Sequence, residues 1–101
     1  MIYGCKRFTW NNDKNKSLKK ERGISFEDVL HYIANGKLLD IIEHPNRSKY
    51  LNQRIFVIKI VDYVYLVPFV ESETEIFLKT IIPSRKATKE YTKGGAESEG
   101  I

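Results

Sequence analysis

The chain has 101 residues, with 17 Lys and Arg against 13 Asp and Glu and a net charge of +4. This length is typical of one small domain, and the charge is compatible with nucleic-acid binding without requiring it. A single Cys5 excludes an intrachain disulfide, no apolar run approaches the roughly 20 residues of a membrane-spanning helix, and the N-terminus lacks the hydrophobic core of a signal peptide. We therefore expect a cytoplasmic protein with one α+β domain over residues 1–92 and a disordered tail over 93–101.

The basic excess lies in the N-terminal third of the chain. A short strand over 8–10 leads into possible cap residues at 11–13, and these predict a helix over about 13–22 that Gly23 ends. One arc of this helix carries three lysines, Lys16, Lys19 and Lys20. The arc lies away from the single apolar residue, Leu18, so a solvated face is the favoured interpretation and a phosphate-binding stripe is the alternative.

A second helix begins at the N-cap Ser25 and ends at Gly36. Asp28 lies three residues after the cap, and Ile24 and Val29 occupy the two positions of a hydrophobic staple. Apolar residues then recur at helical spacing: Phe26, Val29, Leu30, Ile33 and Ala34. This stripe must pack on a sheet, because no other part of the chain offers enough apolar surface to cover it.

From Leu38 the periodicity becomes that of strands, which we expect over 38–44, 54–61, 63–70 and 75–82. Short links join the last three strands, which predicts an antiparallel meander. Pro68 cannot donate a hydrogen bond to the ladder, so it predicts a bulge or an edge-facing position. The expected fold class is α+β, with a β-α-α unit followed by a four-stranded antiparallel meander and a short C-terminal helix.

Alternation along the strands divides the sheet into two faces. The face that packs on the second helix collects apolar residues: Phe56, Ile58, Ile60, Ile76, Leu78 and Ile82. The other face carries Lys59, Phe77, Lys79 and, if the strands pair in this register, Tyr65. Two lysines on one sheet face predict a partly open, basic surface with aromatic rings between the charges. Ordinary pairing of these lysines with Glu71 or Glu75 on a solvated face is the alternative.

Several kinds of site have no signature in the sequence. There is no Cys-x-x-Cys, His-x-x-x-His or glycine-rich phosphate loop, so we expect no metal ion and no cofactor. His31 is predicted to point outward from the second helix. His44, before Pro45 at a strand end, is better placed for a site, although a solvated histidine is its favoured interpretation. A functional site in this chain would be made of Lys, Arg and Tyr.

A basic cluster follows the last predicted strand at a Pro-Ser turn. It contains Arg85 and Lys86, with Tyr91 a few positions further on. Two or three cations and a phenol at one end of a sheet can bind phosphate. The alternatives are an Arg85 at a helix start that pairs with Glu90, and a Tyr91 that packs in the core.

Three motifs in the chain occur together in a known family. Residues 81–88 read Ile-Ile-Pro-Ser-Arg-Lys-Ala-Thr, residues 8–10 read Phe-Thr-Trp with Lys14 four residues after the Trp, and residues 22–28 read Arg-Gly-Ile-Ser-Phe-Glu-Asp. These motifs resemble the last strand and basic helix, the first strand, and the helix junction of the BrnT family of bacterial toxins, which share the RelE-like ribonuclease fold. The resemblance covers about residues 8–91.

The chain departs from the family pattern at two positions. The histidine of the helix junction is Arg22 here, and the asparagine of the first helix is replaced by Leu18. A catalytic role tied to either position therefore does not carry over. The middle of the chain, residues 38–62, matches the family only in outline.

The resemblance implies the toxin of a bacterial type II toxin–antitoxin system. Such a toxin is a metal-independent endoribonuclease that cuts mRNA, inhibits translation, is neutralised by a cognate antitoxin from the adjacent gene, and meets DNA only through the antitoxin complex. The nucleophile is the 2′-OH of the substrate, so the protein has to orient it, stabilise charge and move protons. On that basis Arg85 would bind the non-bridging oxygens, Lys79 would share that charge or act as base, and Tyr91 would transfer a proton or stack on a base.

Four further residues are expected to bind RNA on the same basis: Lys59, Lys86, Tyr65 and His44. Lys59 and Lys86 would hold the flanking backbone. Two other function classes are compatible with the same residues. One is a nucleic-acid-binding module without catalysis, which would leave RNA intact, and the other is an interaction domain that docks a partner on the exposed sheet.

Overall fold

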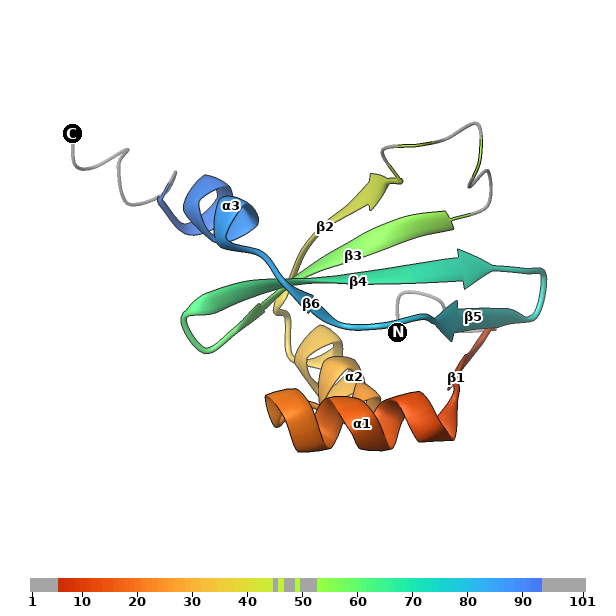
Figure 1. Ribbon diagram of the computed structural model, residues 1–101. Helices are drawn as coiled ribbons and strands as arrows, with labels where there is room; N and C mark the ends of the chain where they lie inside the picture. The colour runs from red at the N-terminus through yellow and green to blue at the C-terminus, as the bar shows by residue number, and fades with distance from the viewer. Residues whose placement is uncertain (1–5, 45, 47–48, 50–52, 94–101) are drawn as a thin grey trace.

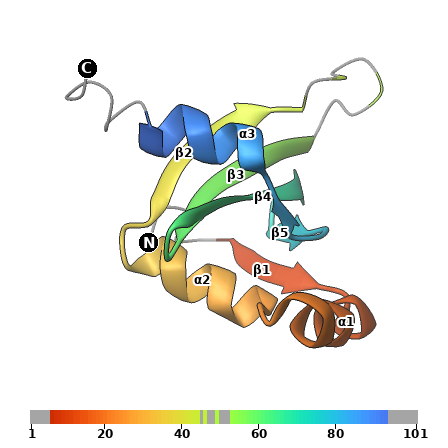
Figure 2. The same cartoon turned by 60° about the vertical axis from the view of Figure 1, so that its left-hand side comes forward.

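A mixed β-sheet lies between two helices on one face and one short helix on the other (Figures 1 and 2). The computed structural model describes residues 6–44, 46, 49 and 53–93. Its elements are β1 (Arg7–Trp10), α1 (Asn12–Arg22), α2 (Phe26–Ala34), β2 (Leu38–Glu43), β3 (Gln53–Ile60), β4 (Tyr63–Glu71), β5 (Glu75–Leu78), β6 (Ile82–Pro83), α3 (Arg85–Thr88) and a π-helical turn, Lys89–Lys93. The α+β class is confirmed. Cys5 and residues 94–101 of the predicted tail lie outside the described residues.

The strands are ordered β1-β5-β4-β3-β2, and β6 also pairs with β4. The consecutive pairs β2/β3, β3/β4 and β4/β5 are antiparallel, which confirms the predicted meander. Strand β1 pairs in parallel with β5, an arrangement that the sequence did not indicate. Among the residues that the structure describes, no helix is long and apolar enough to cross a membrane.

The predicted caps determine where α1 and α2 begin. The side chain of Asn11 accepts a hydrogen bond from the Lys14 N–H at 2.9 Å, and Gly23 ends α1 at a φ of 75°. Ser25 and Asp28 form a reciprocal capping box at the start of α2. Asn15 joins the two helices, because its Oδ1 accepts from the Phe26 N–H at 2.6 Å. Such side-chain caps satisfy N–H groups that a helix start leaves without partners.

The main core lies between the sheet and α1 and α2. It contains thirteen buried residues: Leu18, Ile24, Phe26, Val29, Ile33, Phe56, Ile58, Ile60, Val67, Phe69, Ile76, Leu78 and Ile81. The predicted helix-facing row is confirmed except at its last member. Ile82 is 42% exposed, whereas its neighbour Ile81 is fully buried. A single strand over 75–82 was therefore the wrong prediction, because alternation breaks between β5 and β6.

Pro68 explains this break. The carbonyl groups of Val64 and Pro68 accept hydrogen bonds from Ser84 and Lys79, so this side of β4 faces β5 and β6. The nitrogen of Pro68 faces the same side but carries no hydrogen to donate. Strand β5 ends at Leu78 and β6 begins beyond it, so the irregularity predicted from Pro68 falls on the neighbouring strand.

Glu71 joins three strands through two ion pairs. Its carboxylate accepts from Lys6 Nζ at 2.5 Å, next to β1, and from the guanidinium of Arg54 on β3. The bond from Lys6 lowers the pKa of Glu71, burial opposes this, and Arg54 lowers the pKa further. Because the folded-state pKa lies below the unfolded value, these pairs stabilise the fold above the unfolded pKa. Their contribution is lost as the pH falls through the folded pKa.

We therefore expect Glu71→Gln to lower the melting temperature most near neutral pH. The gap between wild type and variant should narrow as the pH falls below the unfolded-state pKa of glutamate, about 4.3, and should close once the pH passes the lower folded-state pKa of Glu71. Thermal unfolding of both proteins at a series of pH values measures this gap. Glu75→Gln, which removes only the exposed pair with Arg7, is the control and should have a smaller effect. A gap that stays constant with pH would contradict the expectation.

Val61 occupies a strained position in the two-residue turn between β3 and β4. Its φ is 60°, and its side chain is 74% exposed. A β-branched residue is unfavourable there, and hairpin turns with positive φ at the first central residue prefer glycine. Val61→Gly should therefore raise stability by about 0.5–1 kcal/mol, because relief of strain outweighs the added freedom of the unfolded chain. Urea denaturation tests this, and Val61→Ala, which keeps the Cβ atom, should gain much less.

Candidate functional site

Helix α3 is fastened to the sheet by the uncharged residues around its start. The Ser84 side chain caps the helix by accepting from the Ala87 N–H at 3.0 Å. The Thr88 hydroxyl donates to the Ser84 carbonyl at 2.7 Å and accepts from the Val64 N–H at 2.8 Å. The Ser84 N–H in turn donates to the Val64 carbonyl at 3.0 Å. These bonds hold α3 against β4.

A second, smaller apolar cluster lies beneath α3. Figure 2 shows α3 on the sheet face away from α1 and α2. Ala87 is 7% exposed and packs with the fully buried Val57 and Val64. Partly buried residues complete the cluster: Ile42, Leu66 and Tyr91. This cluster gives α3 a docking surface that is separate from the main core.

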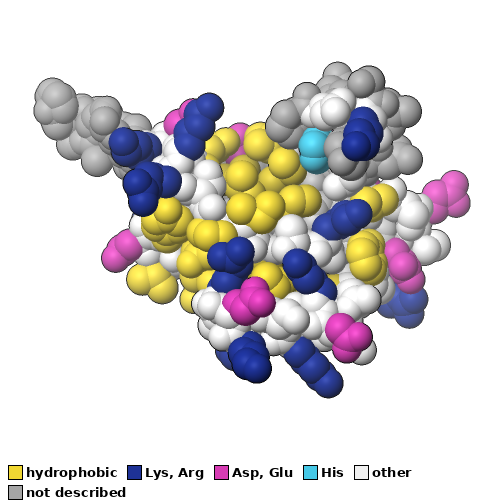
Figure 3. Space-filling view, viewed as in Figure 1, with side chains coloured by type: hydrophobic (Ala, Val, Ile, Leu, Met, Phe, Trp, Pro, Cys, Tyr) yellow, Lys and Arg dark blue, Asp and Glu magenta, His cyan; other side chains and the backbone are white. Residues whose placement is uncertain are grey.

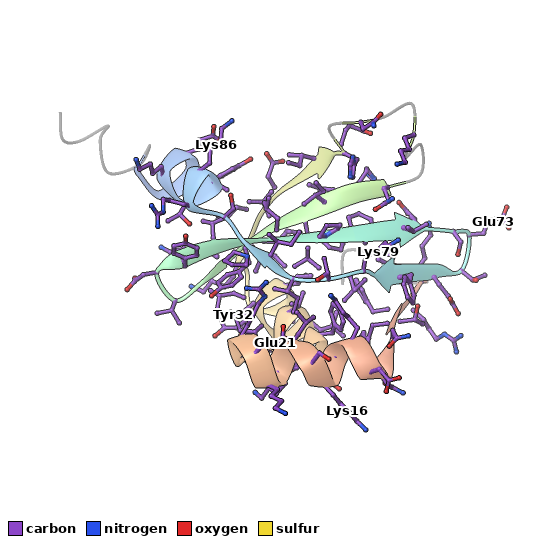
Figure 4. The ribbon with its side chains drawn as sticks, in the orientation of Figure 1. Lys16, Glu21, Tyr32, Glu73, Lys79 and Lys86 are labelled. Carbon is purple, nitrogen blue, oxygen red and sulfur yellow. The ribbon has the colours of Figure 1, made fainter. Side chains whose placement is uncertain are left out.

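Arg85 and Lys86 lie on the exposed side of α3. Figure 4 shows Lys86 on α3 at the outer surface of the molecule. In the part of the chain that the structure describes, neither residue forms an ion pair, and the predicted alternative pairing of Arg85 with Glu90 does not occur. Both cations are therefore free to meet an anionic ligand.

Tyr91 lies on the π-helical turn after α3, packed on the small cluster. Its Oη donates a hydrogen bond to Oδ2 of Asp40 on β2 at 3.0 Å. Burial raises the pKa of Tyr91, and the neighbouring carboxylate of Asp40 raises it further, because each disfavours a phenolate. The phenol therefore holds its proton more tightly than a free tyrosine. This geometry matches the packing alternative for Tyr91, and nothing in the sequence singled out Asp40.

Lys79 is exposed just after β5, and its N–H donates to the Pro68 carbonyl at 2.9 Å. Pro68 is four positions from Val64, the residue that binds Thr88 of α3. Four positions correspond to about 13 Å of strand. Figure 4 likewise shows Lys79 beside β5 and Lys86 well apart on α3. The predicted cations are therefore spread along one region and do not form a single tight group.

The structure places the remaining predicted RNA-binding residues on different parts of the sheet. Lys59 pairs with Val64 and lies on the face that α3 covers, as predicted. Tyr65 was assigned to that face wrongly, because it pairs with Ile58 and packs on the main core. His44 follows β2 at the far end of the sheet, where its Nδ1 accepts from the Asn46 N–H at 3.1 Å.

The sheet face beside α3 combines apolar residues with cations. Figure 3 shows hydrophobic side chains at the surface between α3 and the end of β2, with Lys and Arg side chains around them. Two exposed apolar residues border this face, Phe77 at 37% and Ile82 at 42%. Within the described ranges, no three His, Cys, Asp or Glu side chains gather in a way that could hold a metal ion.

Comparison of the chain with protein-family models, with curated proteins and with solved structures finds no match.

The lysine arc of α1 offers a direct test of where RNA would bind. Lys16, Lys19 and Lys20 are all exposed, and Lys19 pairs with Asp28 at 3.5 Å. We expect the triple change to Gln to leave RNA affinity and its salt dependence unchanged, with a stability shift of about 0.5 kcal/mol or less. Lys86→Gln should instead reduce the slope of log affinity against log salt by about 0.7 on single-stranded RNA. Binding measured over a range of salt concentrations compares the two variants, and a shallower slope for the triple variant would contradict this expectation.

Proposed function

We propose that this protein is a BrnT-like toxin of a type II toxin–antitoxin system, a metal-independent endoribonuclease that cleaves mRNA. The observation that carries the proposal is that residues 84–88 have two separate roles, attachment of α3 to the sheet and exposure of cations. Ser84, Ala87 and Thr88 fasten α3 to the sheet, while Arg85 and Lys86 stay exposed and unpaired in the described part of the chain. A segment built in this way presents two cations from a fixed backbone, as binding to a phosphodiester requires.

Cleavage by these residues requires no bound metal. The 2′-OH of the substrate loses its proton and attacks the adjacent phosphorus, the bond to the 5′-oxygen breaks, and that oxygen takes up a proton and leaves as a 5′-hydroxyl. A 2′,3′-cyclic phosphate remains on the other fragment. Arg85 would stabilise charge on the non-bridging oxygens, and Lys86 would hold the neighbouring backbone. Lys79 would share the charge or act as base from its position after β5. Tyr91 is a weaker candidate for proton transfer, because its hydroxyl already donates a hydrogen bond to Asp40.

The two departures from the family pattern agree with a site centred on α3. Leu18 is 2% exposed in the main core and cannot reach a substrate. Arg22 is exposed in the last turn of α1, which lies across the sheet from α3 (Figure 1). Neither residue is assigned a role in the proposed reaction.

The proposed partner is a cognate antitoxin encoded by the adjacent gene. An acidic or amphipathic segment of that protein would cover the cations near α3 and the apolar residues beside them, which would block access of phosphate. Contact with DNA would occur only through the complex with the antitoxin. Co-expression with the neighbouring gene product should therefore yield a complex that elutes as one species.

A nucleic-acid-binding domain without catalysis is the second candidate. The Tyr91–Asp40 hydrogen bond favours it, because this bond occupies the phenol that was predicted to transfer a proton. The chemistry of the RNA product separates the two candidates. An endoribonuclease of the proposed kind leaves 2′,3′-cyclic phosphate ends, whereas a binding domain leaves RNA intact.

The decisive experiment is to induce this chain alone in a bacterium and follow growth and total RNA over time. The proposed function requires growth arrest, shortened mRNA and fragments with 2′,3′-cyclic phosphate ends. Growth arrest with intact RNA would favour the binding domain. Normal growth and intact RNA at a confirmed level of folded protein would contradict the proposed toxin.

A further inference from the structure

Two tyrosines stand at the hairpin end of β4, on the sheet face that α1 and α2 cover. Alternate residues of β4 point to this face: Tyr63, Tyr65, Val67 and Phe69. Val67 and Phe69 are fully buried, whereas Tyr63 and Tyr65 are only partly buried. Tyr63 and Tyr65 therefore keep part of their surface exposed at the hairpin end of this face.

The two rings pack against each other. Their centroids are 5.7 Å apart and their planes meet at 67°, in an edge-to-face arrangement. Within the residues that the structure describes, neither phenol makes a hydrogen bond. Tyrosine hydroxyls usually find a partner when they are buried, so two phenols without one on partly exposed residues indicate a surface available for contact. The neighbouring turn adds Val61, which is also exposed.

This pair lies next to the segment that leads into α3. Tyr65 pairs across the ladder with Pro83 of β6, and residues paired in this way have Cα atoms about 4.5–5.5 Å apart. Ser84 and Arg85 follow Pro83 directly. The aromatic pair and the cations of α3 therefore flank the same edge strand, one on each side of the sheet.

From this juxtaposition we propose that Tyr63 and Tyr65 form a base-stacking subsite for single-stranded RNA whose phosphates contact Arg85 and Lys86. The inference deepens the proposed function and rests on it. A strand that passes over the β6 edge would place its backbone near the cations and its adjoining bases on the tyrosine rings. Aromatic side chains beside a positively charged track are the common means of holding unpaired bases without a strict sequence preference.

RNA suits this surface better than an acidic protein segment does. An acidic segment would pair with the cations, but its carboxylate side chains offer no flat ring to stack on the two tyrosines. Bases offer such flat groups, and their phosphates supply the negative charge for Arg85 and Lys86. Asp62, in the turn beside Tyr63, is a nearby carboxylate.

The test compares two double variants in the full-length protein. Tyr63→Leu with Tyr65→Leu keeps apolar bulk against Ile58 and Ile60 but removes the flat rings, whereas Tyr63→Phe with Tyr65→Phe keeps the rings and removes the hydroxyls. The probe is a fluorescently labelled single-stranded oligoribonucleotide with 2′-O-methyl groups, which lacks the attacking hydroxyl and stays intact. Binding is measured over a range of salt concentrations, and circular dichroism shows that each variant is folded.

We expect the Leu variant to bind the probe about tenfold more weakly, equivalent to about 1.4 kcal/mol, with an unchanged salt slope. The Phe variant should bind as wild type does. If the Leu variant binds as tightly as wild type while Lys86→Gln has a reduced slope, the stacking subsite is wrong and RNA binding at α3 stands. If folded wild type does not bind the probe, the proposed function itself fails. Loss of a co-purifying protein partner with unchanged RNA affinity would identify the tyrosine pair as a protein interface and overturn the subsite.

Discussion

Arg85→Ala is expected to abolish growth arrest and to lower ribonuclease activity by about 100-fold or more, while the fold stays intact. Arg85 is exposed on α3 and forms no ion pair in the described part of the chain. Its removal deletes the proposed contact with the charged phosphate oxygens and leaves every core contact in place. The stability of the variant should stay within about 0.5 kcal/mol of wild type. Growth after induction, cleavage of RNA in vitro and thermal unfolding measure the three quantities.

Lys79→Ala is the matched comparison for this variant. Lys79 is also an exposed cation, but it lies after β5 and away from α3. Its loss should weaken activity less, because Arg85 and Lys86 remain to share the charge. An Arg85→Ala protein that loses its thermal transition together with its toxicity would make Arg85 a structural residue. Full toxicity of a folded Arg85→Ala protein would remove Arg85 from the proposed reaction.

Ala87→Glu is expected to detach α3 and to abolish activity without removing either cation. Ala87 is 7% exposed against Val57 and Val64, so a glutamate there is too large and buries a charge without a partner. The cost to the docked state should be about 2–4 kcal/mol. Because this cluster is separate from the main core, the sheet with α1 and α2 should stay folded. Activity should fall to about the level of Arg85→Ala.

Amide hydrogen exchange reports the detachment directly. The Val64 N–H donates to the Thr88 hydroxyl and the Ala87 N–H donates to Ser84, so both amides should exchange faster in the variant. Core amides such as those of Phe56 and Ile58 should stay protected. The control is Lys89→Glu, which also introduces a glutamate but at an exposed position, and it should leave α3 docked. Retained activity with a detached α3 would show that the position of the helix does not matter.

Local sequence patterns were sufficient to predict most elements of this protein. The Asn11 cap, the capping box of Ser25 and Asp28 and the positive φ of Gly23 occur where short-range chemistry requires them. The short links between strands predicted the meander, and alternation in β3 and β5 predicted nearly all of its helix-facing row. Each of these features depends on residues close together in the chain, so the sequence carries the information directly.

Features that depend on distant segments were decided only by the tertiary structure. The parallel pairing of β1 with β5 and the hydrogen bond between Tyr91 and Asp40 each join residues far apart in the chain. The face occupied by Tyr65 depends on the register of the β3–β4 hairpin, in which Tyr65 pairs with Ile58. The missing N–H of Pro68 lies opposite the interruption between β5 and β6. Because of this interruption, Ile81 is the buried residue and Ile82, which was predicted to be buried, is exposed. A shift of one residue exchanges the faces of a strand. The sequence by itself therefore determined which cations and rings the protein has, and the register across the ladder decided which of them share a surface.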